Sequence, residues 1–300
     1  MRTDTDLHHP HLEEHDVTPS PYQADLAPTR YVDGPLGETF AYRLLGRPGS
    51  TPPLVLTMRL RGTIDHWDPA FLDAIARERE VIIFDNRGLN ASTGDPASTI
   101  EELVDGTIAF IQALGLPQVD LLGWSMGGMV AFGVALTEPG LVRRLIIAGS
   151  TPGGIPDIPR MSERVGAIAS KPVNSDDDFL ALFFPETPAG REAGTQHLKR
   201  LRYRLDQSQA AISGDAVRGQ LTALGRFREG YWARLEQLEM PVLLANGTHD
   251  VMILADHTYA TARKLTKART VLWSDAAHAF LFQHAEEFAD DIDRFLGSPD

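Results

Sequence analysis

The chain has no cysteine among its 300 residues. It can therefore form neither a disulfide nor a thiol nucleophile, and this composition is typical of the cytoplasm, where we expect the protein to work. Hydrophobic residues make up 43% of the sequence, an ordinary share for a globular protein. We expect a fold whose stability rests on a hydrophobic core alone.

Long apolar runs and an excess of positive charge are also missing. No stretch approaches the roughly 20 apolar residues that span a bilayer, and no positively charged, apolar leader is present. The 28 Lys and Arg residues face 41 Asp and Glu residues, which gives a formal net charge of −13. Because this charge repels phosphate backbones, we expect a small-molecule substrate and neither a nucleic acid nor a membrane as partner. The sequence assigns no oligomeric state.

The most informative segment is Gly-Trp-Ser-Met-Gly-Gly at 123–128. It follows an apolar run at 119–122 and opens a helix-like run at 129–138. A serine at the tip of a sharp strand-to-helix turn projects its Oγ atom away from a sheet, and small flanking residues let strand and helix approach. The helix N-terminus adds free N–H groups and partial positive charge. This context predicts a nucleophile at Ser125 rather than a structural turn.

A serine nucleophile needs a base and an orienting acid. An apolar strand at 240–246 leads into a turn that carries Asp250, and a strand at 268–273 leads into a loop that reaches His278. Because the carboxyl ends of parallel strands meet at one edge of a sheet, both residues should lie beside the serine. Asp85, which follows a strand at 81–84, is a rival acid, although it is more typical of a loop that braces the site.

Four segments carry a family resemblance: Asp-Asn-Arg-Gly at 85–88, the serine motif at 123–128, Asn-Gly-Thr-His-Asp at 246–250 and Asp-Ala-Ala-His-Ala-Phe at 275–280. Together they resemble the serine-hydrolase branch of the α/β-hydrolase superfamily, which includes esterases and cofactor-free haloperoxidases. The resemblance implies an α/β fold with a mostly parallel sheet, flanking helices and a helical cap insertion. It implies Ser125 as nucleophile, His278 as base and Asp250 as acid, with no metal and no organic cofactor.

The chain departs from the family at the oxyanion hole. Family members commonly carry His-Gly where this chain has Met58-Arg59. By the resemblance, the two backbone N–H donors would belong to Leu60 and Met126. Glycine tolerates backbone angles that arginine does not, so the departure puts the geometry of the first donor in question. We expect Arg59 and Arg61 to pair with acidic groups of the scaffold, with an acidic group of the substrate as the alternative.

The sequence divides into three parts. Residues 1–30 are rich in acidic residues, histidine, threonine and proline, which predicts a mobile N-terminal tail. Residues 31–153 and 235–300 are predicted to form the core, including a helix at 69–79. Strand signals are missing from 154–234, which we interpret as the helical cap. The tail holds four histidines for which solvation is favoured over metal binding: His8, His9, His11 and His15.

We expect a serine hydrolase that cleaves a small, largely apolar ester or lactone through an acyl-enzyme intermediate. Apolar residues near the motifs and in the cap are predicted to line its pocket: Trp124, Val251, Met252, Phe280, Phe183 and Phe184. Two alternatives remain open. One is an activity like that of the cofactor-free haloperoxidases and perhydrolases, and the other is ligand binding without hydrolysis, which the Met58-Arg59 departure motivates.

Overall fold

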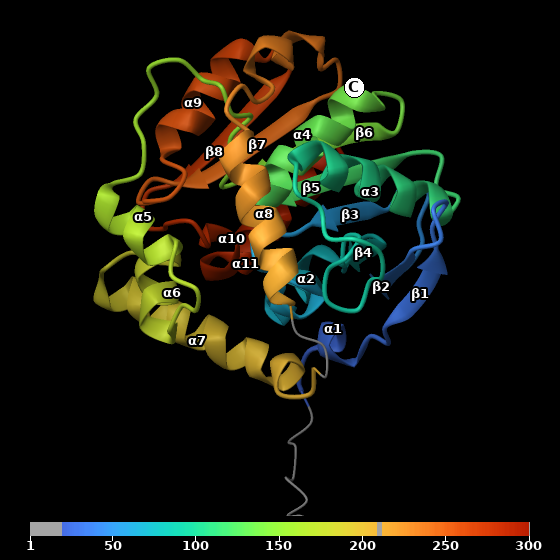
Figure 1. Cartoon of the computed structure of the whole chain (residues 1–300), viewed down its shortest axis with the longest axis horizontal. Coiled ribbons are helices and arrows are strands. Elements are labelled where there is room, and N and C mark those ends of the chain that lie inside the picture. Colours follow the sequence, from blue (N-terminus) through green and yellow to red (C-terminus); the bar gives the residue numbers. More distant parts are fainter. Residues whose placement is uncertain (1–19, 209–211, 300) are drawn as a thin grey trace, which may run out of the picture.

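The computed structural model describes residues 20–208 and 212–299, and within them one eight-stranded sheet forms the centre of the molecule (Figure 1). The spatial order of the strands is β1-β2-β4-β3-β5-β6-β7-β8. The pairs β1–β2 and β2–β4 are antiparallel, and all the other pairs are parallel. The strands are β1 (Arg30–Asp33), β2 (Thr39–Leu45), β3 (Leu54–Thr57), β4 (Val81–Phe84), β5 (Val119–Trp124), β6 (Val142–Ala148), β7 (Val242–Gly247) and β8 (Ala268–Trp273).

Helices cover both faces of the sheet and create two hydrophobic cores. One core includes Phe71 and Phe288, and the other includes Phe110 and Phe132. Strands β3, β4 and β5 are buried along their whole length, as expected for parallel strands with both faces covered. The helices outside the segment between β6 and β7 are α1 (Gln23–Leu26), α2 (Pro69–Ile75), α3 (Ile100–Ala113), α4 (Met126–Thr137), α9 (Ala255–Lys264), α10 (Phe280–Gln283) and α11 (Ala285–Leu296), with the 3-10 turn η1 (Ile64–His66).

The described part of the segment between β6 and β7 contains helices joined by loops and no strand. It contains α5 (Glu163–Ala169), α6 (Asp176–Phe183), α7 (Pro188–Leu205), α8 (Gly214–Arg226) and the 3-10 helix η2 (Trp232–Gln237). The four α-helices each begin after a Ser or Thr whose side chain accepts a backbone N–H, which is a strong local start signal. In Figure 1, α5, α6 and α7 lie at the lower left, and α8 crosses in front of the centre of the sheet.

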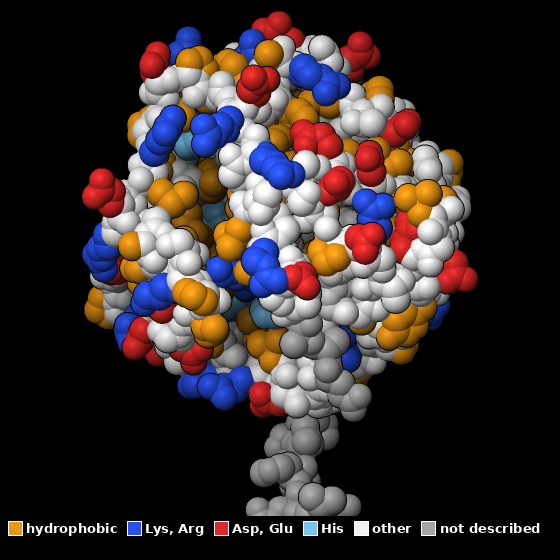
Figure 2. Space-filling view, viewed as in Figure 1, with side chains coloured by type: hydrophobic (Ala, Val, Ile, Leu, Met, Phe, Trp, Pro, Cys, Tyr) orange, Lys and Arg blue, Asp and Glu red, His pale blue; other side chains and the backbone are white. Residues whose placement is uncertain are grey.

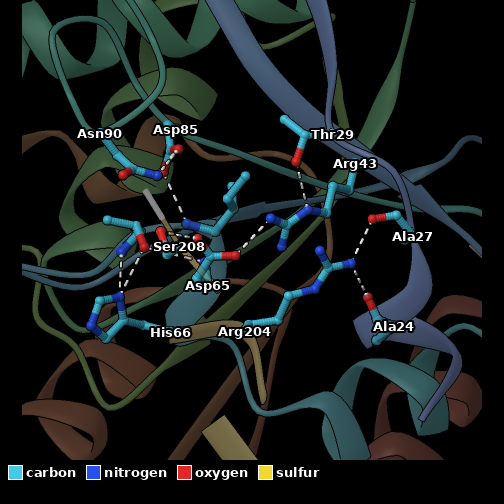
Figure 3. A network of polar contacts seen from close by, with 12 residues as sticks. Ala24, Ala27, Thr29, Arg43, Asp65, His66, Asp85, Asn90, Arg204 and Ser208 are labelled. Carbon is cyan, nitrogen blue, oxygen red and sulfur yellow. Dashed lines mark hydrogen bonds and ion pairs between the residues drawn. The ribbon is translucent and has the colours of Figure 1, made fainter. Parts of the chain in front are cut away.

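Buried polar contacts fasten the end of α7 to the core (Figure 3). Arg43 of β2 pairs with Asp65 at 2.6 Å, and the second oxygen of Asp65 accepts a hydrogen bond from Ser208 at 3.1 Å. Arg204 donates to the carbonyl of Ala27 at 2.6 Å. The hydrogen bonds of Ser208 and Arg204 therefore join the end of α7 to the core.

Part of the predicted tail packs against the core. Residues 1–19, with the four tail histidines, lie outside the described residues. Residues 20–30 contain α1, whose first backbone N–H groups, those of Gln23 and Ala24, donate to Asp73 at 2.9 and 2.8 Å. Ala24 and Ala27 are buried, so residues 20–30 differ from the mobile tail that the sequence predicts for them. Among the described residues, no helix is both long enough and apolar enough to cross a membrane.

Candidate active site

Ser125 occupies a strained turn between β5 and α4. Its φ of 57° and ψ of −124° are unusual for a residue with a side chain, and such angles persist only where the surroundings enforce them. The Ser125 N–H donates to Ala148 at 3.0 Å. Its carbonyl accepts from the Gly128 N–H at 2.9 Å and from the Ser150 hydroxyl at 2.5 Å. These bonds hold the backbone on both sides of the serine side chain.

The glycines around Ser125 are required by close backbone approach. A Cβ atom at Gly123 would lie 2.3 Å from the carbonyl oxygen of Gly127. A Cβ atom at Gly127 would lie 2.1 Å from the carbonyl oxygen of Thr57, at the end of β3. The Thr57 hydroxyl completes this contact by donating to Gly127 at 2.8 Å. The N-terminus of α4 is therefore pressed against the chain that leads to Met58 and Arg59.

Asp250 and His278 come from the loops after β7 and β8 and meet at the same edge of the sheet. His278 Nδ1 lies 2.6 Å from Asp250 Oδ2. The other carboxylate oxygen accepts the N–H groups of Met252 and Ile253 at 2.8 and 2.9 Å. Because the carboxylate can only accept, this network assigns the Nδ1 proton to the imidazole and leaves Nε2 as the acceptor.

The residues next to Ser125 position His278. The Trp124 indole N–H donates to the His278 carbonyl at 3.0 Å, and a Cβ atom at Gly149 would lie 3.3 Å from the imidazole. From the other side, the Ala279 N–H donates to the carbonyl of Phe183 in α6 at 2.9 Å. His278 Nε2 is buried and has no hydrogen-bond partner in the part of the chain described. This atom is free to accept a proton, and catalytic hydrogen bonds commonly tighten only when substrate binds.

Asp85 lies in a different network (Figure 3). Its two oxygens accept the Ile64 N–H at 2.9 Å and the Asn90 amide at 2.7 Å. Burial raises the pKa of Asp85 to about 7, although these hydrogen bonds oppose the shift. Asp85 therefore braces the loop that contains η1, whereas the carboxylate in contact with His278 is Asp250.

The segment Met58–Gly62 forms a tight turn beside α4. The Gly62 N–H donates to the Arg59 carbonyl at 3.1 Å, and the left-handed residue in the turn is Arg61, with a φ of 58°. Arg59 has no such φ, so it does not need glycine's conformational freedom. Leu60 lies in this turn, and Met126 is the first residue of α4, where N–H groups lack an intrahelical partner.

The ion pairs expected for Arg59 and Arg61 are not formed among the described residues. Arg61 instead donates to the Lys171 carbonyl at 2.8 Å and to the Asn174 side chain at 3.1 Å, which ties the turn to the inserted helices. The Arg59 guanidinium lies over aromatic rings, and its one hydrogen bond to the described chain is from Nη1 to the Leu60 carbonyl at 2.8 Å. Burial, with a smaller contribution from Arg61, lowers the pKa of Arg59 to about 10.

Two of the predicted pocket residues lie against His278. The ring centroids of Trp124 and Phe183 are 5.8 and 5.3 Å from that of the imidazole, and the two rings meet edge to face at 5.8 Å. Phe280 is fully buried and packs edge-on against Phe288 in the core. The described structure therefore places Phe280 among core residues.

The other three predicted pocket residues lie around the Asp250 loop. Phe184 and Val251 line a cavity of about 380 Å³ between α5, α6 and this loop, and His249 lines it too. Met252 is partly buried and packs against the first core. These residues could contact a larger ligand, but they do not surround His278 as Trp124 and Phe183 do.

Sequence reasoning missed a buried polar cluster and one aromatic residue next to the site. The Nδ1 atom of His197 in α7 lies 2.7 Å from Oδ2 of Asp68, and Nη2 of Arg200 lies 2.6 Å from the same oxygen. The His197 ring stacks on Phe282 at 4.6 Å. The aromatic residue is Phe179 of α6, whose ring stacks on that of Phe183 at 4.1 Å. No motif marks these positions, because their meeting depends on how the inserted helices dock.

The chain belongs to the alpha/beta hydrolase fold family, whose profile matches residues 52–285. Among solved structures, an alpha/beta hydrolase fold protein from Chitinophaga pinensis is 29% identical, with a TM-score of 0.84, covering 92% of this chain and 99% of that one. A putative carbamate hydrolase, RutD, from Rhizobium rhizogenes is 26% identical, covering 84% of this chain and 95% of the relative. A pimeloyl-[acyl-carrier protein] methyl ester esterase from Nitrosomonas europaea is 25% identical, covering 82% and 96%. The protein is thus a member of a family of hydrolases.

Proposed function

We propose that the protein is a serine hydrolase that cleaves a small ester or lactone through an acyl-enzyme intermediate. The observation that carries this proposal is the Asp250–His278 hydrogen bond at 2.6 Å, with His278 Nε2 left without a partner next to the Ser125 turn. A strained serine, an imidazole with a free acceptor nitrogen and an orienting carboxylate are the parts that acyl transfer requires.

In the proposed mechanism His278 Nε2 takes the proton of Ser125 as its Oγ atom attacks the substrate carbonyl. The N–H groups of Leu60 and Met126 then stabilise the tetrahedral oxyanion. Each such donor typically lowers the activation free energy by about 3 kcal/mol. His278 returns the proton to the leaving group, and water attacks the acyl-enzyme in the same way. Asp250 keeps the imidazole in the required tautomer and stabilises its cation.

The aromatic surroundings and the relatives support the substrate class. Trp124 and Phe183 present apolar ring surface beside His278, which suits the uncharged carbonyl region of an ester or lactone. The named relatives act on a carbamate and on a methyl ester. In both kinds of compound the bond that breaks joins a carbonyl carbon to nitrogen or oxygen, which agrees with the proposed chemistry.

The test is hydrolysis of methyl and nitrophenyl esters of increasing acyl length by wild type and by Ser125→Ala. We expect turnover by wild type and none above background by the variant, with an unchanged melting temperature. Equal turnover by both proteins would remove Ser125 from the mechanism. Hydrogen peroxide added to the same assays separates the haloperoxidase-like alternative, which requires formation of peracid, and binding without hydrolysis predicts no turnover by either protein.

A further inference from the structure

We propose that Arg59 binds a carboxylate carried by the substrate, so that the preferred substrate is an ester or lactone with an acidic group near the bond that is cleaved. This inference rests on the proposed function, because it places the carboxylate of a substrate beside the proposed catalytic residues Ser125 and His278. It adds to the expected small, largely apolar substrate an anionic group at the end away from the reacting carbonyl.

The position of Arg59 carries the first step of the argument. Its guanidinium carbon lies 5.2 Å from the ring centroid of Phe183 and 5.6 Å from that of Trp124. The same two rings lie 5.3 and 5.8 Å from the His278 ring. Arg59 and the imidazole therefore contact the same two aromatic rings, and the proposed substrate would lie along these rings.

The hydrogen-bonding capacity of Arg59 is largely unused. A guanidinium has five N–H donors, and the described chain provides one acceptor, the Leu60 carbonyl at 2.8 Å. The Nε atom is buried without a partner. The rings of Trp124, Phe179 and Phe183 hold the guanidinium by cation–π contact, which fixes its orientation but does not satisfy its N–H groups. A carboxylate would satisfy them with charge-assisted hydrogen bonds.

No protein acid neutralises Arg59 within the described residues. Asp85 lines the same small cavity of about 30 Å³ as Arg59, but its oxygens accept from Ile64 and Asn90. Two further buried acids are paired with other side chains: Asp65 with Arg43, and Asp68 with His197 and Arg200. A cation taken from water without an anion is costly, and a substrate carboxylate would offset that cost.

A second arginine adds positive charge near Arg59. Arg61 lowers the pKa of Arg59, and Arg59 and His197 together lower the pKa of His66, which desolvation also depresses. The face drawn in Figure 2 shows hollows beside α8 with histidine and cationic side chains inside them. This local field contrasts with the net charge of −13 of the whole chain and would attract an anionic group into the site.

The test compares two esters that differ in one terminal group: monomethyl glutarate and methyl pentanoate, which carry a carboxylate and a methyl group at the same position. The measured quantity is the ratio of their kcat/KM values, followed by pH-stat. We expect wild type to favour the acidic ester. Because a hydrogen bond to a charged group contributes about 1.5–3 kcal/mol, Arg59→Gln should reduce the ratio by roughly 10- to 100-fold. Arg59→Lys, which keeps the charge without the planar fork, should restore part of it.

A matched control is Arg218→Gln on α8. Arg218 is an exposed arginine paired with Asp215, and its removal changes the net charge by the same amount. This variant should keep the wild-type ratio. If Arg59→Gln lowers kcat/KM for both esters equally, or if wild type does not favour the acidic ester, Arg59 has a structural role and the inference is overturned.

Binding of glutarate separates this inference from the proposed function. Glutarate should raise the melting temperature of wild type and of Ser125→Ala in a saturable way, but not that of Arg59→Gln. If no ester is hydrolysed and this pattern is still found, the proposed function fails while the carboxylate site stands. If both esters are hydrolysed alike and glutarate has no effect on wild type, the carboxylate site fails while the proposed function stands, and this outcome requires no folded variant.

Discussion

The Nδ1 atom of His278 and the Oδ2 atom of Asp250 lie 2.6 Å apart, although the two residues are 28 positions apart in the chain. Both side chains are buried, and the second oxygen of Asp250 is occupied by two backbone N–H groups. The carboxylate therefore has a single orientation toward the imidazole. This contact gives a direct way to distinguish Asp250 from Asp85.

Replacing Asp250 by Asn should reduce kcat for ester hydrolysis by about 10³- to 10⁴-fold, because an amide in this position favours the wrong imidazole tautomer. The melting temperature should change little, since the side chain keeps its size. Steady-state kinetics with a methyl ester measures the effect. Asp85→Asn is the matched comparison. If Asp85→Asn lost most of its kcat while Asp250→Asn kept the wild-type value, the carboxylate that orients His278 would be Asp85.

Replacing Gly127 by Ala should destabilise the protein by about 3 kcal/mol, because overpacking against rigid backbone is costly. The added methyl group would lie 2.1 Å from the carbonyl oxygen of Thr57. Gly166→Ala in α5 is the control: no atom lies within 4 Å of the added carbon, and alanine should stabilise this helix by about 0.5–1 kcal/mol. Urea unfolding measures both values, and equal effects would contradict the close approach of α4 to β3.

Acidification should destabilise the fold through His66. Desolvation, together with the charges of Arg59 and His197, lowers the pKa of His66 from 6.5 to about 3, and its Nδ1 atom accepts from Thr63. The unfolded chain therefore binds a proton between pH 6.5 and 3 that the folded chain does not. Stability from this group is present above pH 6.5 and is lost as the pH falls, by up to about 1.4 kcal/mol per pH unit.

The comparison for His66 is His66→Asn, whose side-chain oxygen can accept the same hydrogen bonds but does not titrate. The free energy of unfolding of both proteins is measured from pH 4 to pH 7. The variant should show the shallower loss of stability on the acidic side. Parallel curves would mean that His66 titrates alike in the folded and unfolded chain.

The sequence predicted those parts of the fold that depend on local pattern. Strands β4 and β8 have the predicted bounds, because short runs rich in apolar and β-branched residues between breakers define them. The helix predicted at 69–79 ends at Ile75, and Arg77 and Arg79 beyond its end form ion pairs with α11. The sequence predicted that residues 20–30 belong to a mobile polar tail. In the structure, hydrogen bonds to Asp73 join this stretch to the core.

The candidate site divides in the same way. Ser125, Asp250 and His278 could be named as candidate site residues from the sequence, because each follows a strand within a short motif. The surroundings of Arg59 could not be read, since they depend on α6 bringing Phe179 and Phe183 over a turn more than 100 residues earlier. The scaffold ion pairs expected for Arg59 are not formed among the described residues, where the docked helices enclose its guanidinium among aromatic rings.

The most direct test of the account is the reaction of the wild-type protein with a fluorophosphonate, followed by intact-mass and peptide-mass analysis. The phosphonyl oxygen occupies the position of the oxyanion, so the reaction requires Ser125, His278 and the two backbone donors together. We predict one probe per chain, attached to Ser125, and no labelling of Ser125→Ala. A folded wild-type protein that is not labelled, or that is labelled at another residue, would contradict the account.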